Sequence, residues 1–107
     1  PIIFAPTGYT RFMYHVGEPA VAKVAEDNQL IYCLSTMGTT APDELADAVP
    51  GSRRWFQLYM MQNRDQSLDM INKAKNNGFE TLVVTVDTPV SGHRYSKWSH
   101  HSTTPWF

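Results

Sequence analysis

The chain has 107 residues, the size of one domain at most, and its 42% apolar residues are enough to build a core. Nine basic and ten acidic residues leave a net charge of −1. The chain thus lacks the excess of basic residues that is typical of proteins that bind nucleic acid or anionic lipid, and we expect neither partner. A single cysteine excludes an internal disulfide framework, and without a secretory signal or an apolar run near the ~20 residues of a spanning helix we expect a cytoplasmic protein with no membrane insertion.

Four short runs rich in Val, Ile, Leu, Phe and Tyr predict strands at residues 2–5, 30–34, 55–58 and 82–86. The runs are continuously apolar and do not alternate. This pattern is typical of strands in a parallel sheet that is covered on both faces. Antiparallel hairpins are therefore disfavoured.

Helical patterns separate these runs. Residues 17–28 predict the first helix, with an apolar face made of Ala20, Val21, Val24 and Ala25. The second helix is expected to start at the Thr40 hydroxyl, just before a proline and two acids, and to end at Pro50. Residues 65–77 predict the third helix, with Gly78 as its C-cap and with an apolar face made of Leu68, Ile71 and Ala74.

The resulting order, β-α-β-α-β-α-β, repeats at an interval close to the ~31 residues per unit of a ~250-residue eight-unit barrel. We therefore expect an α/β fold that forms part of a (β/α)8 TIM barrel, with about four parallel strands. A doubly wound open sheet is the alternative. It is less favoured because the first strand-helix turn, residues 5–9, lacks the glycine-rich phosphate fingerprint of dinucleotide-binding folds.

Polar residues stand at the carboxyl end of every predicted strand, where barrels place their active sites. The main ones are Thr7, Ser35, Thr36, Gln57, Tyr59, Thr85 and Asp87. An isolated Ser or Thr at such a position is more often a turn residue that satisfies backbone groups. Four polar strand ends together offer neutral donors and acceptors, which suit the edge of a heteroaromatic, flavin-like ring better than a phosphate or a metal.

Five segments carry a resemblance to a known family: residues 5–8, 16–18, 34–36, 55–59 (Trp-Phe-Gln-Leu-Tyr) and 85–94 (Thr-Val-Asp-Thr-Pro-Val-Ser-Gly-His-Arg). In order and spacing they resemble the FMN-dependent α-hydroxy acid oxidases and dehydrogenases, the family of lactate and glycolate oxidases. The resemblance implies an FMN-dependent oxidoreductase that oxidises a small, lactate-like L-2-hydroxy acid to the 2-oxo acid by hydride transfer to the flavin.

The resemblance also implies a role for each matching residue. At the cofactor, it places backbone atoms against the flavin ring at Pro6, Thr7 and Gly8, and side-chain hydrogen bonds to the flavin edge at Ser35, Gln57 and Thr85. Gly8 would allow close approach because it has no side chain.

On the substrate side, Tyr59 matches the catalytic-site tyrosine whose hydroxyl contacts the substrate. Met37 is expected to line the substrate pocket, and Arg94 matches an arginine at its mouth. Asp87 matches the carboxylate that hydrogen-bonds the catalytic histidine and favours its imidazolium form. A helix-cap or loop carboxylate is the alternative for Asp87.

The family's catalytic histidine, its neighbouring arginine, its flavin-contacting lysine and its phosphate loop belong to the second half of the barrel, and no residue here matches them. The resemblance thus implies an N-terminal half-barrel fragment over residues 1–94, inactive in isolation, followed by an atypical tail over residues 95–107. A non-catalytic truncated product, or an interaction module that folds only on association, is the alternative.

Half a barrel leaves two open strand edges and exposes inner side chains near Val84 and Val86. We therefore expect a homo-oligomer, or completion by the missing half barrel.

Cys33 is expected to be a core residue. No metal site is expected from His93, His100 and His101, because their spacing provides no second ligand pair, and residues 53–54 (Arg-Arg) are expected to be a solvated strand entry.

Overall fold

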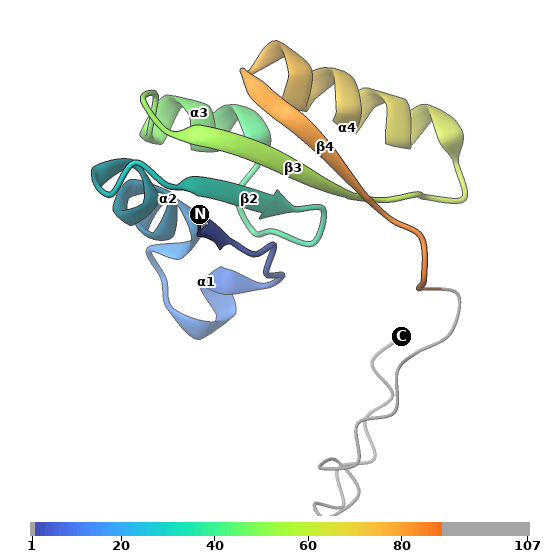
Figure 1. The fold of residues 1–107 in the computed structure, drawn as a ribbon. Coiled ribbons are helices and arrows are strands. Elements are labelled where there is room, and N and C mark those ends of the chain that lie inside the picture. The colour runs from blue at the N-terminus through green and yellow to red at the C-terminus, as the bar shows by residue number, and fades with distance from the viewer. Residues whose placement is uncertain (1, 89–107) are drawn as a thin grey trace, which may run out of the picture.

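A computed structural model describes residues 2–88, which form a four-stranded parallel sheet and four helices (Figure 1). In chain order the elements are β1 (Ile3–Phe4), α1 (Thr10–Met13), α2 (Gly17–Asp27), β2 (Ile31–Ser35), α3 (Pro42–Ala48), β3 (Arg53–Tyr59), α4 (Arg64–Asn76) and β4 (Phe79–Thr85). The strands lie side by side in sequence order, each parallel to the next. The parallel α/β arrangement is as predicted, whereas α1 was not predicted. Arg94 and the expected tail over residues 95–107 lie outside the described residues.

The two faces of the sheet differ because alternate residues of a strand point to opposite sides. One face packs against α2, α3 and α4 and forms the buried core: Ala22, Ala25, Tyr32, Leu34, Leu45, Val49, Phe56, Leu58 and Ala74. The opposite face carries the intervening residues of β2 and β3, namely Cys33, Ser35, Trp55, Gln57 and Tyr59. We call these the helix face and the inner face.

The predicted apolar face of α2 is wrong at Val24, which is 52% exposed. Ala25 of the predicted face is fully buried, and so are Glu18 and Ala22, which were not predicted to be on it. These three share one side of the helix, being four and three residues apart. A carboxylate thus occupies a core-facing position of α2, and two small alanines let the helix approach the sheet.

The predicted apolar face of α4 is wrong at Leu68, which is 55% exposed. The neighbouring Ser67 is buried, and its hydroxyl accepts a hydrogen bond of 3.0 Å from the backbone N–H of Met61. This bond ties the loop after β3 to the first turn of α4. A polar contact, which hydrophobic periodicity does not register, therefore sets the rotation of the helix.

Of the two arginines at the start of β3, Arg53 is exposed to solvent and Arg54 is buried. Arg53 is exposed and pairs with Glu80 of β4, with 3.0 Å between Nη2 and Oε2. Arg54 is only 7% exposed, so the expectation of a solvated side chain is wrong there. The difference follows from alternation, because Arg54 points to the helix face with Phe56.

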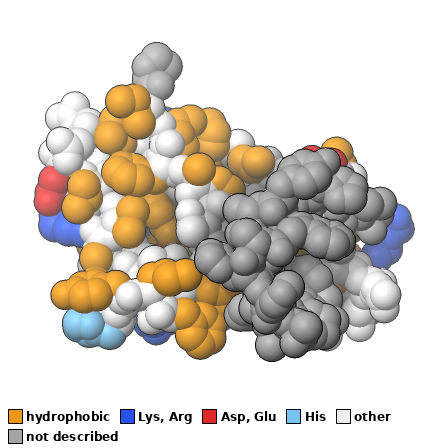
Figure 2. Space-filling model, turned by 90° about the horizontal axis from the view of Figure 1, so that it is seen from below, with side chains coloured by type: hydrophobic (Ala, Val, Ile, Leu, Met, Phe, Trp, Pro, Cys, Tyr) orange, Lys and Arg blue, Asp and Glu red, His pale blue; other side chains and the backbone are white. Residues whose placement is uncertain are grey.

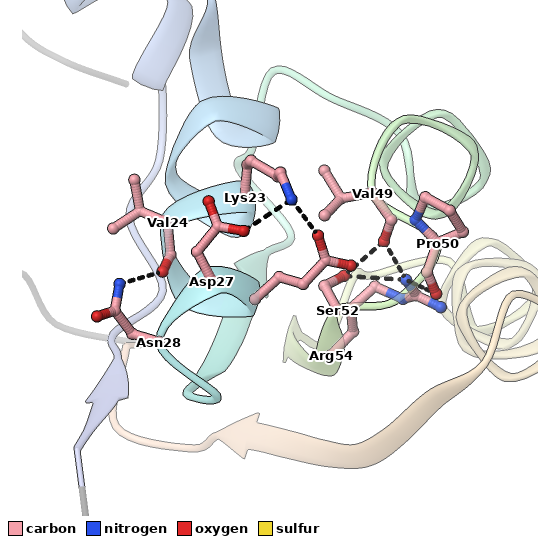
Figure 3. Close-up of polar contacts among 9 residues, drawn as sticks. Lys23, Val24, Asp27, Asn28, Val49, Pro50, Ser52 and Arg54 are labelled. Atoms are coloured by element: carbon pink, nitrogen blue, oxygen red, sulfur yellow. Dashed lines mark hydrogen bonds and ion pairs between the residues drawn. The ribbon is translucent and has the colours of Figure 1, made fainter.

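The Arg54 guanidinium donates to backbone carbonyls at the ends of two helices. Nη1 contacts the carbonyl of Val49, the C-cap of α3, at 2.8 Å, and Nη2 contacts the carbonyl of Asn77, the C-cap of α4, at 3.2 Å. Figure 3 shows the guanidinium against Val49, Pro50 and Ser52, together with the separate pair of Lys23 and Asp27 on α2. Since helix C-termini carry partial negative charge, this buried cation stabilises both ends.

The pairing of β3 with β4 contains one register shift. Arg54 lies beside Phe79, but the next residue, Trp55, lies beside Thr81, so β4 has one extra residue, Glu80, at this point. Beyond the shift the pairing is regular and places Val84 beside Leu58 on the helix face. Val84 and Val86 are exposed, as expected, but the assignment of Val84 to the inner face is wrong.

Exposed apolar side chains gather around β1 and α1. Among them, Ile2, Phe12, Met13 and Tyr14 are each at least 65% exposed. Figure 2 shows hydrophobic side chains over much of the visible part of this side of the molecule. No helix within residues 2–88 has both the length and the apolar character needed to cross a membrane.

Candidate functional site

A hydrogen-bonded chain of three side chains crosses the sheet at the carboxyl ends of β2, β3 and β4. The Ser35 hydroxyl donates to Gln57 Oε1 at 3.1 Å, and Gln57 Nε2 donates to Thr85 Oγ1 at 2.9 Å. Ser35 and Gln57 are adjacent in the parallel register and buried, whereas Thr85 is half-buried. The structure therefore brings together the three side chains expected at a flavin edge.

The orientation of the Gln57 amide follows from its other partners. Oε1 also accepts from the backbone N–H of Thr36 at 3.3 Å, so the carbonyl end of the amide faces β2 and the NH2 end faces β4. The Thr36 hydroxyl donates to the Gln57 carbonyl at 2.6 Å and accepts from the Tyr59 N–H at 3.0 Å. These contacts continue the strand pairing past the end of β2 and hold Gln57 in place.

Two donors of this network have no acceptor among residues 2–88: the second N–H of Gln57 and the O–H of Thr85. Gln57 Nε2 makes one hydrogen bond, and Thr85 Oγ1 accepts that same bond with one of its two lone pairs, so its O–H stays available. The Ser35 hydroxyl, by contrast, donates to Gln57 and accepts from the Met37 N–H at 3.1 Å. The network can thus donate to a neutral or anionic acceptor at its β4 end.

The segment after β1 packs closely against the turn after β2. The Tyr9 N–H donates to the Met37 carbonyl at 2.9 Å, and a Cβ at Gly8 would lie 2.9 Å from Met37 Cβ. The lack of a side chain at Gly8 therefore allows close packing against Met37, which is 36% exposed. Pro6 and Thr7 are exposed at the same end of the sheet. The flavin contacts of all three residues stay a prediction.

Tyr59 and Asp87 lie at the same end of the sheet as the network. Tyr59 is half-buried at the end of β3, beside Thr85 in the register. Asp87 is exposed two residues after β4 and makes no side-chain hydrogen bond within residues 2–88. Arg94 lies outside the described part of the chain. The structure thus leaves the expected roles of Asp87 and Arg94 as predictions.

Glu18 is a buried carboxylate beside this site that the sequence did not single out for a function. It is fully buried, and its oxygens accept hydrogen bonds from the Thr39 N–H at 2.6 Å and from the Thr39 and Thr40 hydroxyls at 2.7 Å each. Burial raises the pKa of Glu18, but these hydrogen bonds outweigh it and lower the pKa to about 2. Two signals were available: its helical spacing with Ala22 and Ala25, and its place in the segment of residues 16–18 that resembles the family.

The Thr40 hydroxyl was expected to begin the second helix, and this is wrong. The N-cap of α3 is Ala41, with Pro42 as the first helical residue, and the Thr40 hydroxyl donates to Glu18 instead. A buried carboxylate is the stronger acceptor, because hydrogen bonds to charged groups are stronger than neutral ones. Thr40 therefore belongs to the surroundings of Glu18.

A cavity of about 300 Å³ lies behind the turn after β2. Its walls include Leu34 and Phe56 of the helix face, Met70 and Lys73 of α4, and Thr40. Ser35 and Thr36 are the polar strand-end residues among its lining residues. The cavity is therefore on the far side of the sheet from the two free donors.

Cys33 is buried on the inner face, as predicted for a core residue. Burial raises the pKa of its thiol to about 11, so the reactive thiolate form is disfavoured. Within residues 2–88 no group of three or more His, Cys, Asp or Glu side chains is placed to hold a metal ion. Neutral hydrogen-bonding groups therefore dominate this end of the sheet.

Comparison with known proteins identifies the family. The sequence model of the FMN-dependent dehydrogenases matches residues 1–106. The chain belongs to this family. A Mycobacterium tuberculosis protein named as an L-lactate dehydrogenase is 46% identical over 94 residues, and an L-lactate oxidase from Lysinibacillus sphaericus is 37% identical over 94 residues. These matches cover 88% of this chain and 23% and 24% of the two relatives.

Solved structures of the family have the same fold. A mandelate oxidase bound to (S)-2-phenylpropionate superposes with a TM-score of 0.84 at 35% identity, covering 99% of this chain and 31% of that one. An (S)-mandelate dehydrogenase gives a TM-score of 0.84 at 30% identity, covering 98% and 29%. The predicted family and the partial (β/α)8 barrel are confirmed. The chain spans about a quarter of the length of the curated relatives that it matches.

Proposed function

We propose that this chain provides the flavin-ring side of an FMN-dependent oxidoreductase that oxidises a small L-2-hydroxy acid, such as lactate, to the 2-oxo acid. The observation that carries the proposal is the chain of hydrogen bonds through Ser35, Gln57 and Thr85, with two donors left free at its β4 end. Membership of the FMN-dependent dehydrogenase family supports it.

The residues at the strand ends suit the flavin ring of FMN. The ring edge presents neutral nitrogen and carbonyl oxygen atoms, which pair with amide and hydroxyl groups without a charged partner. The free N–H of Gln57 and the O–H of Thr85 would donate to this edge, and the backbone of residues 6–8 would lie against the ring. FMN, when bound, accepts the hydride equivalent that the substrate loses.

Residues of the same edge would hold the substrate. The Tyr59 hydroxyl would donate a hydrogen bond to the hydroxy acid, Arg94 would attract its carboxylate, and Met37 would supply apolar contact. Asp87 would stabilise the positive charge on a histidine that takes the substrate proton. No residue of this chain matches the family's catalytic histidine, so that base is assigned to the remainder of the protein.

FMN binding by the full-length protein that carries this sequence tests the proposal. Replacing Gln57 with Leu removes one free donor and the bonds that orient Ser35 and Thr85, so we expect the dissociation constant for FMN to rise at least about tenfold. Flavin fluorescence quenching measures it. Gln66→Leu, at an exposed position of α4, is the matched control and should leave the constant unchanged.

Equal FMN affinity for Gln57→Leu and Gln66→Leu would contradict the assignment of the network to the flavin. Turnover of L-lactate, glycolate and L-mandelate by the full-length protein then identifies the substrate class. The 107-residue chain alone, supplied with FMN, should give no turnover. Turnover by the chain alone would show that the base lies within it.

A further inference from the structure

We propose that Glu18 is a positioning residue for the flavin site: its carboxylate holds the turn that follows β2 and thereby fixes the direction of the Ser35 hydroxyl. This inference rests on the proposed function, because it concerns the same site. Glu18 touches none of the predicted flavin-contacting residues, so it would act through the turn alone.

A buried charge must be paired or hydrogen-bonded, because its burial is otherwise costly. Glu18 is fully buried, and no Lys or Arg side chain within residues 2–88 forms an ion pair with it. Its charge is balanced by donors from two consecutive residues, the N–H and hydroxyl of Thr39 and the hydroxyl of Thr40. Moving the turn would leave the carboxylate unpaired and buried, which is costly.

Two further hydrogen bonds connect the turn held by Glu18 to Ser35. The Gly38 N–H donates to the Ser35 carbonyl at 2.9 Å, and the Met37 N–H donates to the Ser35 hydroxyl at 3.1 Å. A Cβ at Gly38 would lie 2.9 Å from the Ser35 carbonyl oxygen and 3.4 Å from Glu18 Oε1. The turn is therefore a tight unit with Ser35 at one end and the Glu18 contacts at the other.

Helix α1 supports Thr39 through Arg11. The backbone N–H of Arg11 donates to Thr39 Oγ1 at 3.1 Å, while that hydroxyl donates to Glu18. Arg11 packs against Gly17, where φ is +63° and a Cβ would lie 2.5 Å from Arg11 Cγ. The glycine before Glu18 thus leaves room for the segment that orients the Thr39 hydroxyl.

The geometry predicts which binding contacts depend on Glu18. With Glu18 neutral, the turn loses its anionic acceptor and the Met37 N–H no longer holds the Ser35 lone pair in one direction. Ser35 then becomes a poorer partner for Gln57, whose free N–H is proposed to face the flavin edge. Thr85 lies two strands away and keeps its bond to Gln57, so its contribution should not depend on Glu18.

A double-mutant cycle on the full-length protein with FMN tests this. We expect Glu18→Gln to raise the FMN dissociation constant about fivefold or more, and to change the absorbance spectrum of the bound flavin. The matched control, Glu26→Gln, lies on the same helix at the amino end of the sheet and should leave both unchanged. Combining Glu18→Gln with Ser35→Ala should add little to the larger single effect, whereas combining it with Thr85→Val should multiply the two effects.

Multiplicative effects with Ser35→Ala, or an FMN affinity equal to that of Glu26→Gln, would overturn the inference. If Glu18→Gln does not fold, as circular dichroism would show, Thr40→Val removes one donor and keeps the charge, and the same cycle is run with it. Failure of the unmodified protein to bind FMN would instead count against the proposed function.

Discussion

The two ends of the parallel sheet both bury polar side chains, but they use them differently. At the amino end, the two terminal nitrogens of Arg54 donate to fixed backbone carbonyls and to Ser52, and its Nε is buried without a hydrogen-bond partner among residues 2–88, where no ligand can reach it. At the carboxyl end, Gln57 and Thr85 keep donors at a half-buried edge. The comparison shows stabilising contacts at one end and contacts available for a ligand at the other, the usual division in barrels.

The amino end should show the largest effect on stability. Arg54→Met removes the donor to the ends of α3 and α4 and the contact of the guanidinium with the Phe79 ring, whose centroid lies 5.7 Å away. We expect the free energy of unfolding to fall by about 3 kcal/mol, because buried carbonyls lose their partner. Urea unfolding measures it. Loss of FMN affinity without loss of stability would reverse the proposed division.

Glu18 should make stability depend on pH in the acid range. Its folded-state pKa is lowered from 4.5 to about 2, so its contribution is complete above about pH 4.5 and is lost as the pH falls through 2. The shift corresponds to about 3 kcal/mol. Urea midpoints between pH 6 and pH 2.5 should fall less steeply for Glu18→Gln than for the unmodified protein. Parallel curves would show that the carboxylate is not the cause.

Thr85→Val should affect binding more than stability. The substitution keeps the shape of the side chain and removes the free O–H, so we expect FMN affinity to fall by about 1 kcal/mol, roughly five- to tenfold. The free energy of unfolding should change by less than about 1 kcal/mol. Thr81→Val, at an exposed position on the same strand, is the control. An equal loss of FMN affinity in both variants would remove Thr85 from the site.

Arg53→Met should have the smallest effect. The pair of Arg53 with Glu80 is exposed at both partners, and such surface pairs contribute ~0 to 1 kcal/mol. We expect less than about 0.5 kcal/mol, and less still at high salt. Comparison with Arg54→Met under identical conditions sharpens the contrast between adjacent arginines. A loss as large as that of Arg54→Met would show that exposure does not govern their contributions.

The order of strands and helices could be predicted because local patterns determine it. Apolar runs marked β2 and β3, and the third predicted helix ends where expected, although its C-cap is Asn77 and the predicted C-cap, Gly78, with φ at +74°, follows it. Burial of charge could not be predicted in this way. Glu18 and Arg54 look like surface residues until the turn after β2 and the ends of α3 and α4 surround them.

The residues of the site could be predicted from the sequence, but the hydrogen bonds between them could not. The family resemblance pointed to Ser35, Gln57 and Thr85, but a sequence does not state which atoms meet. Their hydrogen bonds depend on the pairing of β2 with β3 and of β3 with β4, which are contacts between residues 22 and 28 positions apart. The mistaken side for Val84 has the same origin, because the register shift near Glu80 is a property of two strands together.

The register shift also decides where the length of β4 can change. Since the side chains of a strand alternate, removing one residue between Thr81 and Thr85 would turn the side chains that follow it to the opposite face and place Val86 where Thr85 meets Gln57, although no site residue had been substituted. Removing the extra residue, Glu80, would instead leave Thr81 beside Trp55 and Thr85 beside Tyr59. Single-residue deletions between Thr81 and Thr85 should therefore be as damaging as loss of the threonine itself, whereas deletion of Glu80 should keep Thr85 in place.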